Sequence, residues 1–262
     1  MIIDFHTHAF PDPIAPGALS VLESKAGVKA SGNGTVDSIL ESMDNSGVDF
    51  SVLCPVSTKA SQVKSINSWI KGIGNDRIIP FGTLFPGMDN VEEEAKMLNE
   101  AGVRGIKLHP DYQSFFVDDE VAFPMYDACA KYKLMILFHA GVDIGLPPPV
   151  HATPKALAYV ANNWPELKII TAHMGGYMLW DDVRKNLVGK DLFFDTAYYS
   201  KGISETLFLD LMREHGSEKV LFATDFPWLN QKEAVDTLNS WGLTESEKSL
   251  LFYENARNLL GL

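Results

Sequence analysis

Eight short apolar segments recur along the chain, and each is followed by a more polar stretch that carries helical signals. The segments cover residues 2–8, 49–56, 78–85, 103–109, 134–139, 167–173, 192–196 and 220–225. Alternation of strand-length apolar segments with helical stretches is typical of parallel strands that are joined by helices. The sequence therefore predicts an α/β fold.

The number of strand and helix units selects one architecture. Eight units in 262 residues match the usual length of a (β/α)8 barrel of the TIM type. An open doubly wound sheet usually has fewer strands, and a Gly-rich phosphate-binding turn follows its first strand. Here His6 and His8 stand at that place. We predict a single (β/α)8 barrel domain over residues 1–262, with its active site at the carboxyl ends of the strands.

The connection after the first strand is unusually long. Residues 9–34 are rich in Pro, Gly, Ser and Lys and show no long period. We expect this stretch to be an enlarged first βα loop of the barrel rather than a linker between two domains.

Helix boundaries are marked at several places. Apolar residues at spacings of three and four precede Gly47, which stands where a C-terminal cap is expected. The pairs Asp89 with Glu92 and Thr244 with Glu247 resemble capping boxes that begin two later helices.

Composition narrows the class of partner. The formal net charge of −12 and the isoelectric point near 5.0 disfavour nucleic acid and anionic membrane surfaces, which select basic patches. A small-molecule substrate is expected instead. Cys54 and Cys129 stand far apart in apolar surroundings, so we predict reduced core residues. No apolar run reaches the roughly 18 residues of a membrane span, and no basic stretch precedes the first strand, so we expect a cytoplasmic location.

Polar residues close five of the predicted strands: His6 and His8, Lys107 and His109, His139, His173, and Asp225. Only two of the seven histidines, His151 and His215, lie elsewhere. Because the carboxyl ends of barrel strands meet at one face, these side chains are expected to converge. Imidazole and carboxylate groups are preferred ligands of Zn²⁺ and similar ions, and a bound ion turns water into a nucleophile near neutral pH. The pattern predicts a metal centre.

Side-chain alternation adds further candidates. Asp4 shares the face of His6 but lies deeper, where we expect it to support a metal ligand. Lys107 shares the face of His109. The alternatives to functional roles are a snorkelling lysine and a histidine that only satisfies a loop carbonyl. Asp195 closes the seventh strand, where it either orients a ligand or caps the strand.

Six motifs along the chain resemble the amidohydrolase superfamily, in particular the branch that contains the amidohydrolase-related decarboxylases. They are IDFHTH at residues 3–8, GIKLHP at 105–110, LFHAG at 137–141, AHMGG at 172–176, FATDFP at 222–227 and ENARNL at 254–259. The motifs follow the family's order and span the whole chain.

The resemblance implies a distorted barrel that holds a divalent metal, with Zn²⁺ as the first expectation and Mn²⁺ as the second. The ligands would be His6, His8, His139 and Asp225. In relatives with one ion, the histidine that corresponds to His173 acts as a general acid or base. In relatives with two ions it is a ligand, and a carboxylated lysine at the position of Lys107 bridges the metals. One ion is favoured here, and two remain open. Relatives also suggest a homodimer.

Metal-assisted hydrolysis of an amide, ester or lactone bond of a small molecule is the first functional hypothesis. His173 would orient a water, Asp225 would move its proton, and Lys107 and His109 would bind the substrate. The alternative is a metal-dependent non-oxidative decarboxylase of a small aromatic or unsaturated carboxylic acid. A third possibility is a barrel that only binds a metal or ligand, and the complete ligand set argues against it.

Three loops are expected to set the substrate: residues 9–34, 111–118 and 141–153. Their aromatic residues could wall a flat or apolar ligand, or could only pack the loops onto the barrel. The candidates are Phe10, Tyr112, Phe115 and Phe116, together with Tyr198, Tyr199 and Trp228 after the last two strands.

Overall fold

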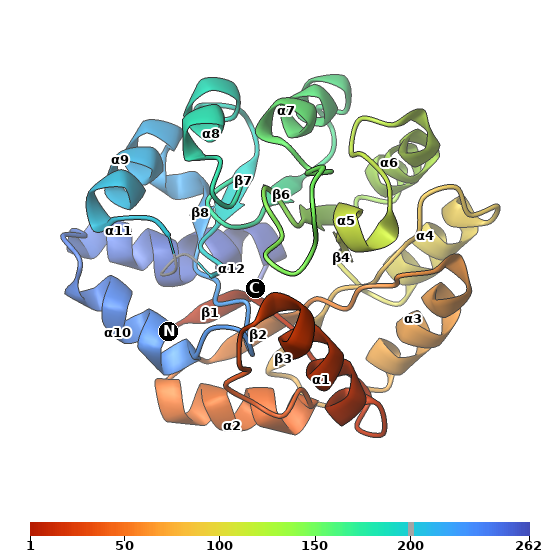
Figure 1. Cartoon of the computed structure of the whole chain (residues 1–262), viewed down its shortest axis with the longest axis horizontal. Helices are drawn as coiled ribbons and strands as arrows, with labels where there is room; N and C mark the ends of the chain where they lie inside the picture. The colour runs from red at the N-terminus through yellow and green to blue at the C-terminus, as the bar shows by residue number, and fades with distance from the viewer. Residues whose placement is uncertain (199–201) are drawn as a thin grey trace.

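The computed structural model describes residues 1–198 and 202–262, and in these residues two arcs of parallel strands form one barrel (Figure 1). The first arc contains β1 (Ile3–Thr7), β2 (Phe50–Leu53) and β3 (Ile78–Pro80), in that order. The second contains β4 (Gly105–Leu108), β5 (Met135–Phe138), β6 (Ile169–Thr171), β7 (Phe193–Asp195) and β8 (Val220–Leu221). Each strand lies within one of the eight predicted apolar segments, which confirms the predicted fold class.

Backbone hydrogen bonds join the two arcs at both seams. Between β3 and β4, the Gly82 amide donates to the Gly105 carbonyl at 2.8 Å, and the Lys107 amide donates to the Gly82 carbonyl at 3.0 Å. Between β8 and β1, the Asp225 amide donates to the His6 carbonyl at 2.9 Å. The second seam places the end of β8 directly beside the histidines that end β1.

Helices surround the strands, most of them on the outside of the barrel and the first of them across its near face (Figure 1). They are α1 (Ala15–Ala26), α2 (Val36–Ser46), α3 (Val63–Lys71), α4 (Val91–Glu100), α5 (Pro110–Gln113), α6 (Phe123–Lys131), α7 (Pro154–Asn163), α8 (Trp180–Asn186), α9 (Glu205–His215), α10 (Gln231–Ser240), α11 (Glu245–Ser249) and α12 (Asn255–Leu260). Short 3₁₀ turns lie at Ala60–Gln62, Glu120–Ala122 and Ser217–Lys219, and a π turn at Leu250–Glu254 joins α11 to α12. None of the helices in the described ranges is long and apolar enough to cross a membrane.

Two apolar cores hold these layers together. The barrel interior contains Phe5 and Phe81, whose rings meet edge to face at 5.8 Å. A larger core fills the space between the strands and the surrounding helices. Cys54 and Cys129 are buried and free, as predicted. The interior is therefore packed, and the site can form only at the strand ends.

The enlarged first loop is present, but it contains the twelve-residue helix α1, which the sequence did not predict. Only Ala15 and Leu19 of this helix are buried, so it lacks the core-facing apolar period by which helices are recognised. Its end is marked by Gly27, a left-handed cap with φ 67°.

Two of the three capping predictions are confirmed, and one is wrong. Gly47 caps α2 with φ 71° and Thr244 forms a complete capping box with Glu247, as expected. The predicted box of Asp89 is wrong, because α4 begins after Asn90 and no side chain caps it.

Candidate active site

The strand ends open into a cavity of about 880 Å³. All seven residues that the sequence marked as ligands or catalytic groups line it: His6, His8, Lys107, His109, His139, His173 and Asp225. The convergence follows from the parallel strands, whose last residues all point to the same end of the barrel. The predicted site residues therefore lie in one place, and their arrangement decides what they can do.

Hydrogen bonds made by Nδ1, on the side of each ring away from the cavity, fix the orientation of His6 and His8. His6 Nδ1 lies 2.9 Å from Asp195 Oδ2, and His8 Nδ1 lies 2.8 Å from the Cys54 carbonyl oxygen. Each of these oxygens can only accept, so both Nδ1 atoms donate. A neutral imidazole that donates through Nδ1 keeps a lone pair on Nε2. Burial lowers the pKa of His6 well below its usual value, and the nearby Lys107 adds to this effect, so His6 is neutral at pH 7.

The two Nε2 atoms meet a carboxylate oxygen. They lie 3.1 Å apart, and Asp225 Oδ1 is 3.0 Å from that of His8 and 3.5 Å from that of His6. With neutral rings these three atoms all present lone pairs and repel one another unless positive charge is placed among them, as Lys107 Nζ, 2.9 Å from His6 Nε2, does and as a bound cation would. A tetrahedral zinc ion with bonds of about 2.0–2.1 Å would separate its ligands by about 3.3 Å. The three side chains therefore fit a divalent cation.

Asp225 is held as an anion. Burial alone would raise the pKa of this carboxyl, but protonated His6 and His8 outweigh burial and lower the pKa to about 2. When the rings are neutral, a bound cation would supply that positive charge instead. Its backbone has φ 63°, a left-handed conformation that is costly for a residue with a side chain.

Burial raises the pKa of Asp4 to about 7. Asp4 stabilises this turn by accepting hydrogen bonds from the Thr224 amide at 3.0 Å and from Gln231 Nε2 at 2.7 Å.

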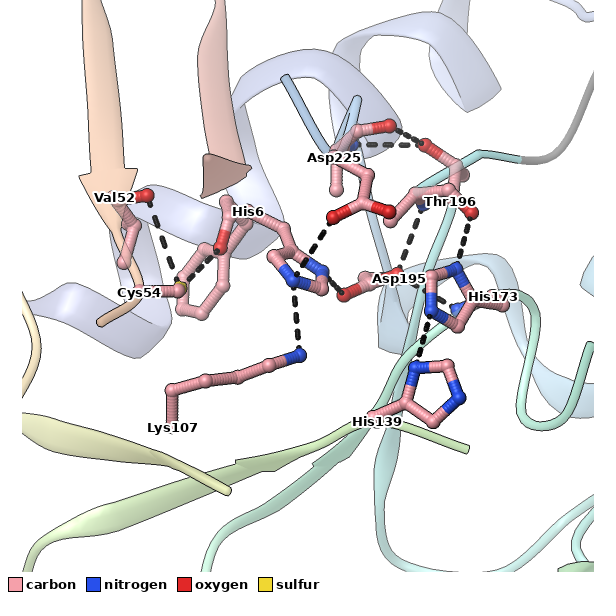
Figure 2. A network of polar contacts seen from close by, with 12 residues as sticks. His6, Val52, Cys54, Lys107, His139, His173, Asp195, Thr196 and Asp225 are labelled. Carbon is pink, nitrogen blue, oxygen red and sulfur yellow. Dashed lines mark hydrogen bonds and ion pairs between the residues drawn. The ribbon is translucent and has the colours of Figure 1, made fainter. Parts of the chain in front are cut away.

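Lys107 carries a buried amine into the same group (Figure 2). Its Nζ donates to His6 Nε2 at 2.9 Å, and the side chain is 1 % exposed. Burial lowers the pKa of this amine, although Asp195 and Asp225 oppose the shift. The lysine therefore lies at the lone pair that a metal would use, and a bound ion would require the amine to lose its proton or move.

His173 and His139 form a second chain of hydrogen bonds beside the first (Figure 2). His173 Nδ1 donates to the Ala197 carbonyl at 2.8 Å, and its Nε2 lies 3.1 Å from His139 Nδ1. When His173 is neutral, its Nε2 accepts from His139, which leaves a lone pair on His139 Nε2. That atom is buried and has no hydrogen-bond partner among the described residues. A buried imidazole nitrogen that has a lone pair and no hydrogen-bond partner is suited to bind a metal ion.

Glycine keeps these two histidines adjacent. Gly141, two residues after His139, has φ 84°, and a Cβ there would clash with backbone atoms of Gly176 and Tyr177. Only glycine allows this close approach of the loops that follow β5 and β6. The motif spacing in the sequence thus has a steric cause.

The four residues predicted as metal ligands are not all brought together. His6, His8 and Asp225 offer ligand atoms within 4.8 Å of one another, whereas His139 falls in a second group with His109 and Asp143. Asp143 could not be predicted from the sequence, because it lies in the loop after β5, where no strand register indicates the direction of a side chain.

His109 has a structural role as well as a place in the cavity. Its Nδ1 accepts from the Tyr112 amide at 3.4 Å and so caps the short helix α5. A neutral His109 therefore carries its proton on Nε2, which lies 3.2 Å from Asp143 Oδ2. Its ring stacks on that of His139, with centroids 4.0 Å apart. The alternative noted from the sequence, a bond to a loop carbonyl, is replaced by a bond to a loop amide.

The sequence allowed two roles for Asp195, to orient a ligand or to cap its strand. In the structure its carboxylate contacts both His6 and His173. Besides His6 Nδ1, it accepts from the backbone amides of His173 and Ala197, each at 2.9 Å. One buried carboxylate therefore fixes the orientation of His6 and the position of His173, whose backbone is left-handed with φ 59°.

The predicted aromatic wall is partly confirmed. Phe10, Tyr112, Tyr198 and Trp228 line the cavity. Phe115 is buried in the core instead, and Phe116 stacks on His151 at 4.5 Å, outside the cavity. Tyr199 lies outside the described residues. Helix α1 lies within residues 9–34, which were expected to set the substrate, and it lines the cavity, whereas the wall contributed by α3 was not predicted from the sequence.

Comparison with known proteins places these features in context. A family model described as Amidohydrolase matches residues 3–262. A γ-resorcylate decarboxylase of Polaromonas sp. is 27 % identical over 130 residues, which are 43 % of this chain and 40 % of that protein. The matched stretch is thus less than half the length of this curated relative.

Solved structures share the fold over the whole chain. The 5-carboxyvanillate decarboxylase of Sphingomonas paucimobilis has a TM-score of 0.76 at 14 % identity, covering 100 % of this chain and 99 % of that one. A dihydroxybenzoic acid decarboxylase of Polaromonas sp., solved with bound manganese and an inhibitor, has a TM-score of 0.70 at 16 % identity, with coverage of 100 % and 97 %. At these identities the likeness shows a common fold.

Proposed function

The chain belongs to the amidohydrolase family, and we propose that within it the protein is a metal-dependent, non-oxidative decarboxylase of an aromatic carboxylic acid. This is the second of the two enzymatic hypotheses drawn from the sequence. The relatives described above are named decarboxylases, and these names support it over hydrolysis, which was the first hypothesis.

The observation that carries the proposal is the division of the cavity into two ends. Imidazoles, carboxylates and the Lys107 amine gather at the strand ends, while aromatic and aliphatic side chains form the walls toward the opening. A ring acid matches this division, because its carboxylate needs cations and its ring needs flat apolar walls.

A divalent ion held by His6, His8 and Asp225, with His139 Nε2 as the fourth candidate ligand, would supply positive charge to the substrate carboxylate and an adjacent hydroxyl. Zn²⁺ and Mn²⁺ both accept imidazole and carboxylate ligands. The bound manganese of the Polaromonas decarboxylase supports testing both metals. Of the two groups, only that of His6, His8 and Asp225 directs two imidazole lone pairs to one point, because the Tyr112 amide occupies Nδ1 of His109 in the other, and this supports one ion per chain.

Loss of carbon dioxide leaves an electron pair on the ring carbon, and a proton must replace the carboxylate there. We assign this proton to His173 Nε2. The carbonyl of Ala197 holds Nδ1, so an imidazolium would donate its second proton through Nε2, after this atom exchanges its contact with His139 Nδ1, 3.1 Å away, for the substrate carbon. Asp225 is a poorer donor, because its pKa of about 2 keeps it ionised. Its role is to bind and orient.

The decisive experiment is carbon dioxide release. Protein loaded with Mn²⁺ or Zn²⁺ is incubated with a panel of hydroxybenzoates, and bicarbonate and the phenolic product are both measured. Equal amounts of the two are expected, with none from metal-free protein. Hydrolysis of aryl esters or lactones without carbon dioxide release from any acid would overturn the proposal in favour of the hydrolase. Homodimer formation stays a prediction, for sedimentation to test.

A further inference from the structure

The cavity does not end at the polar groups but continues outward between two helices. Its outer walls include Ala18, Val21 and Leu22 of α1 and Ile66 and Trp69 of α3. Figure 1 shows α1 on the near side of the barrel, in front of β3. We call these five residues the tail groove. They belong to neither the candidate metal group nor the hydrogen-bonded chain of His173.

Helix α1 presents one continuous face to this groove. Seven positions near its start and along it line the cavity at helical spacing, namely Ile14, Gly17, Ala18, Val21, Leu22, Lys25 and Ala26. Ser20 and Ser24, on other faces of the helix, are exposed and do not line the cavity. An apolar stripe that faces a cavity rather than the core is suited to contact a ligand.

Large apolar side chains remain exposed around this opening. Ile14 and Val21 are each 55 % exposed, and Ile144 on the loop opposite is 46 % exposed. All three line the same cavity. Contiguous apolar exposure of this kind in a soluble protein marks a surface that is covered when its ligand is present.

Charge is sparse along the groove. The 3₁₀ turn before α3 contributes Gln62 and α3 contributes Ser65 as polar, uncharged neighbours. Lys25 of α1 also lines the cavity, and its Nζ lies 5.7 Å from the centroid of the Tyr112 ring. The whole cavity, at about 880 Å³, lies near the top of the range of about 300–1,000 Å³ for sites that hold drug-sized ligands. A single-ring acid would fill only its polar end.

We propose that the tail groove binds an apolar substituent of the substrate, so that the preferred acid carries an alkyl or second aryl group on the side of its ring opposite the carboxylate. This inference rests on the proposed function for the identity of the acid end. Continuity with the strand-end groups favours the substrate itself as occupant, because a tail in the groove and a carboxylate at the metal ligands would belong to one molecule.

The test is a series of 2,6-dihydroxybenzoates with 4-alkyl chains from hydrogen to hexyl. We expect kcat/KM to rise about fourfold for each buried methylene, through KM rather than kcat, because the tail is bound equally in ground and transition states. Rates that are equal along the series, or that fall with length, would overturn the inference.

Two matched variants locate the effect. Val21→Asp places a charge in the groove and should reduce the ratio of kcat/KM for the hexyl and unsubstituted acids by at least tenfold. Ser24→Asp adds the same charge to an exposed position of the same helix and should leave that ratio unchanged. Ile66→Ala removes apolar contact on α3 and should reduce the gain in kcat/KM along the series by about the contribution of one methylene. This variant checks the result independently of α1.

Failure of the proposed function can be separated from failure of the groove. If no acid releases carbon dioxide, calorimetric titration with 5-alkylresorcinols, which carry the chain at the same ring position as the 4-alkyl acids, measures the groove without turnover. Affinity that rises with chain length in the native chain and in Ser24→Asp, but not in Val21→Asp, would retain the groove. Affinity independent of length would refute it.

Discussion

Two groups of two imidazoles and one carboxylate lie in the same cavity, and they differ in where their protons are. His6, His8 and Asp225 form the first group, and His109, His139 and Asp143 the second. Within each group the potential ligand atoms lie within 4.8 Å of one another. Residue type and spacing alone would make the two groups equal candidates for a metal.

The hydrogen-bond partners of the Nδ1 atoms distinguish the two groups. In the first group both Nδ1 atoms donate to oxygens, so in neutral rings each Nε2 keeps a lone pair on the cavity side, where Lys107 Nζ donates to that of His6 and Asp225 Oδ1 lies 3.0 Å from that of His8. In the second, the Tyr112 amide occupies His109 Nδ1, which puts the proton on Nε2, toward Asp143. A ring whose inward nitrogen is protonated cannot bind a metal without giving up that arrangement. Only His139 of the second group keeps a bare nitrogen.

The largest expected effect comes from neutralising the first group. Asp225→Asn keeps the size of the side chain but removes the charge that holds a cation beside two lone pairs. We expect kcat to fall by at least about 10³-fold, together with loss of the bound metal. Turnover within a few-fold of the parent, with metal retained, would contradict the role given to this group.

Metal removal and return should separate the groups by stability. A ligand present at about a thousand times its Kd stabilises the folded state by about 4 kcal/mol, which corresponds to roughly 10 °C for a chain of this size. We expect this shift when Mn²⁺ or Zn²⁺ is returned to the stripped native chain and to Asp143→Asn. Asp225→Asn should show none. A shift that Asp143→Asn lacks would move the metal to the second group.

The sequence predicted the barrel and the residues at its mouth because both depend on short-range patterns. Strand-length apolar segments identified β1 to β8, and the direction of parallel strands then brought their last residues together. Asp195 was visible for the same reason, as the last residue of β7. These features need only a residue's position relative to the end of a buried strand.

What could not be predicted depends on contacts between distant segments. Helix α1 buries few residues in the core. The role of its apolar face can therefore be inferred only when the fold shows that α3 lines the same cavity. Asp143 lies in a loop, where side-chain direction has no period. The tautomers of His8 and His109 are set by the Cys54 carbonyl and the Tyr112 amide, and neither backbone group has a signal in the sequence.

A smaller effect is expected behind the first group. Asp195→Asn keeps an oxygen near His6 Nδ1, but its amide can also donate there and so favour the tautomer with its lone pair on the wrong nitrogen. We expect metal affinity to fall by about 10- to 100-fold, as measured by competition with a chelator. Asp191→Asn is the matched control, since Asp191 is exposed beside Lys219. Equal affinities in the two variants would show that the hydrogen bond from behind is unimportant.

The smallest effect should come from Asp143→Asn, which tests the second group directly. Burial lowers the pKa of His109 well below its usual value, so the contact with Asp143 joins a neutral ring to a carboxylate and is not an ion pair. An asparagine oxygen can accept the same Nε2 proton at 3.2 Å. Removing the charge should therefore cost only a few-fold in KM.

Metal content gives Asp143→Asn its power to discriminate. One ion per chain in both the parent and the variant is expected, by elemental analysis of protein purified without chelator. Asp111→Asn, which alters the buried carboxylate beside His151, controls for changes in the neighbouring loops. If the parent holds two ions and Asp143→Asn holds one, His109 must surrender its bond to the Tyr112 amide on binding metal. The second group would then be a metal site formed by its ion, whereas the first is preformed by the residues behind it.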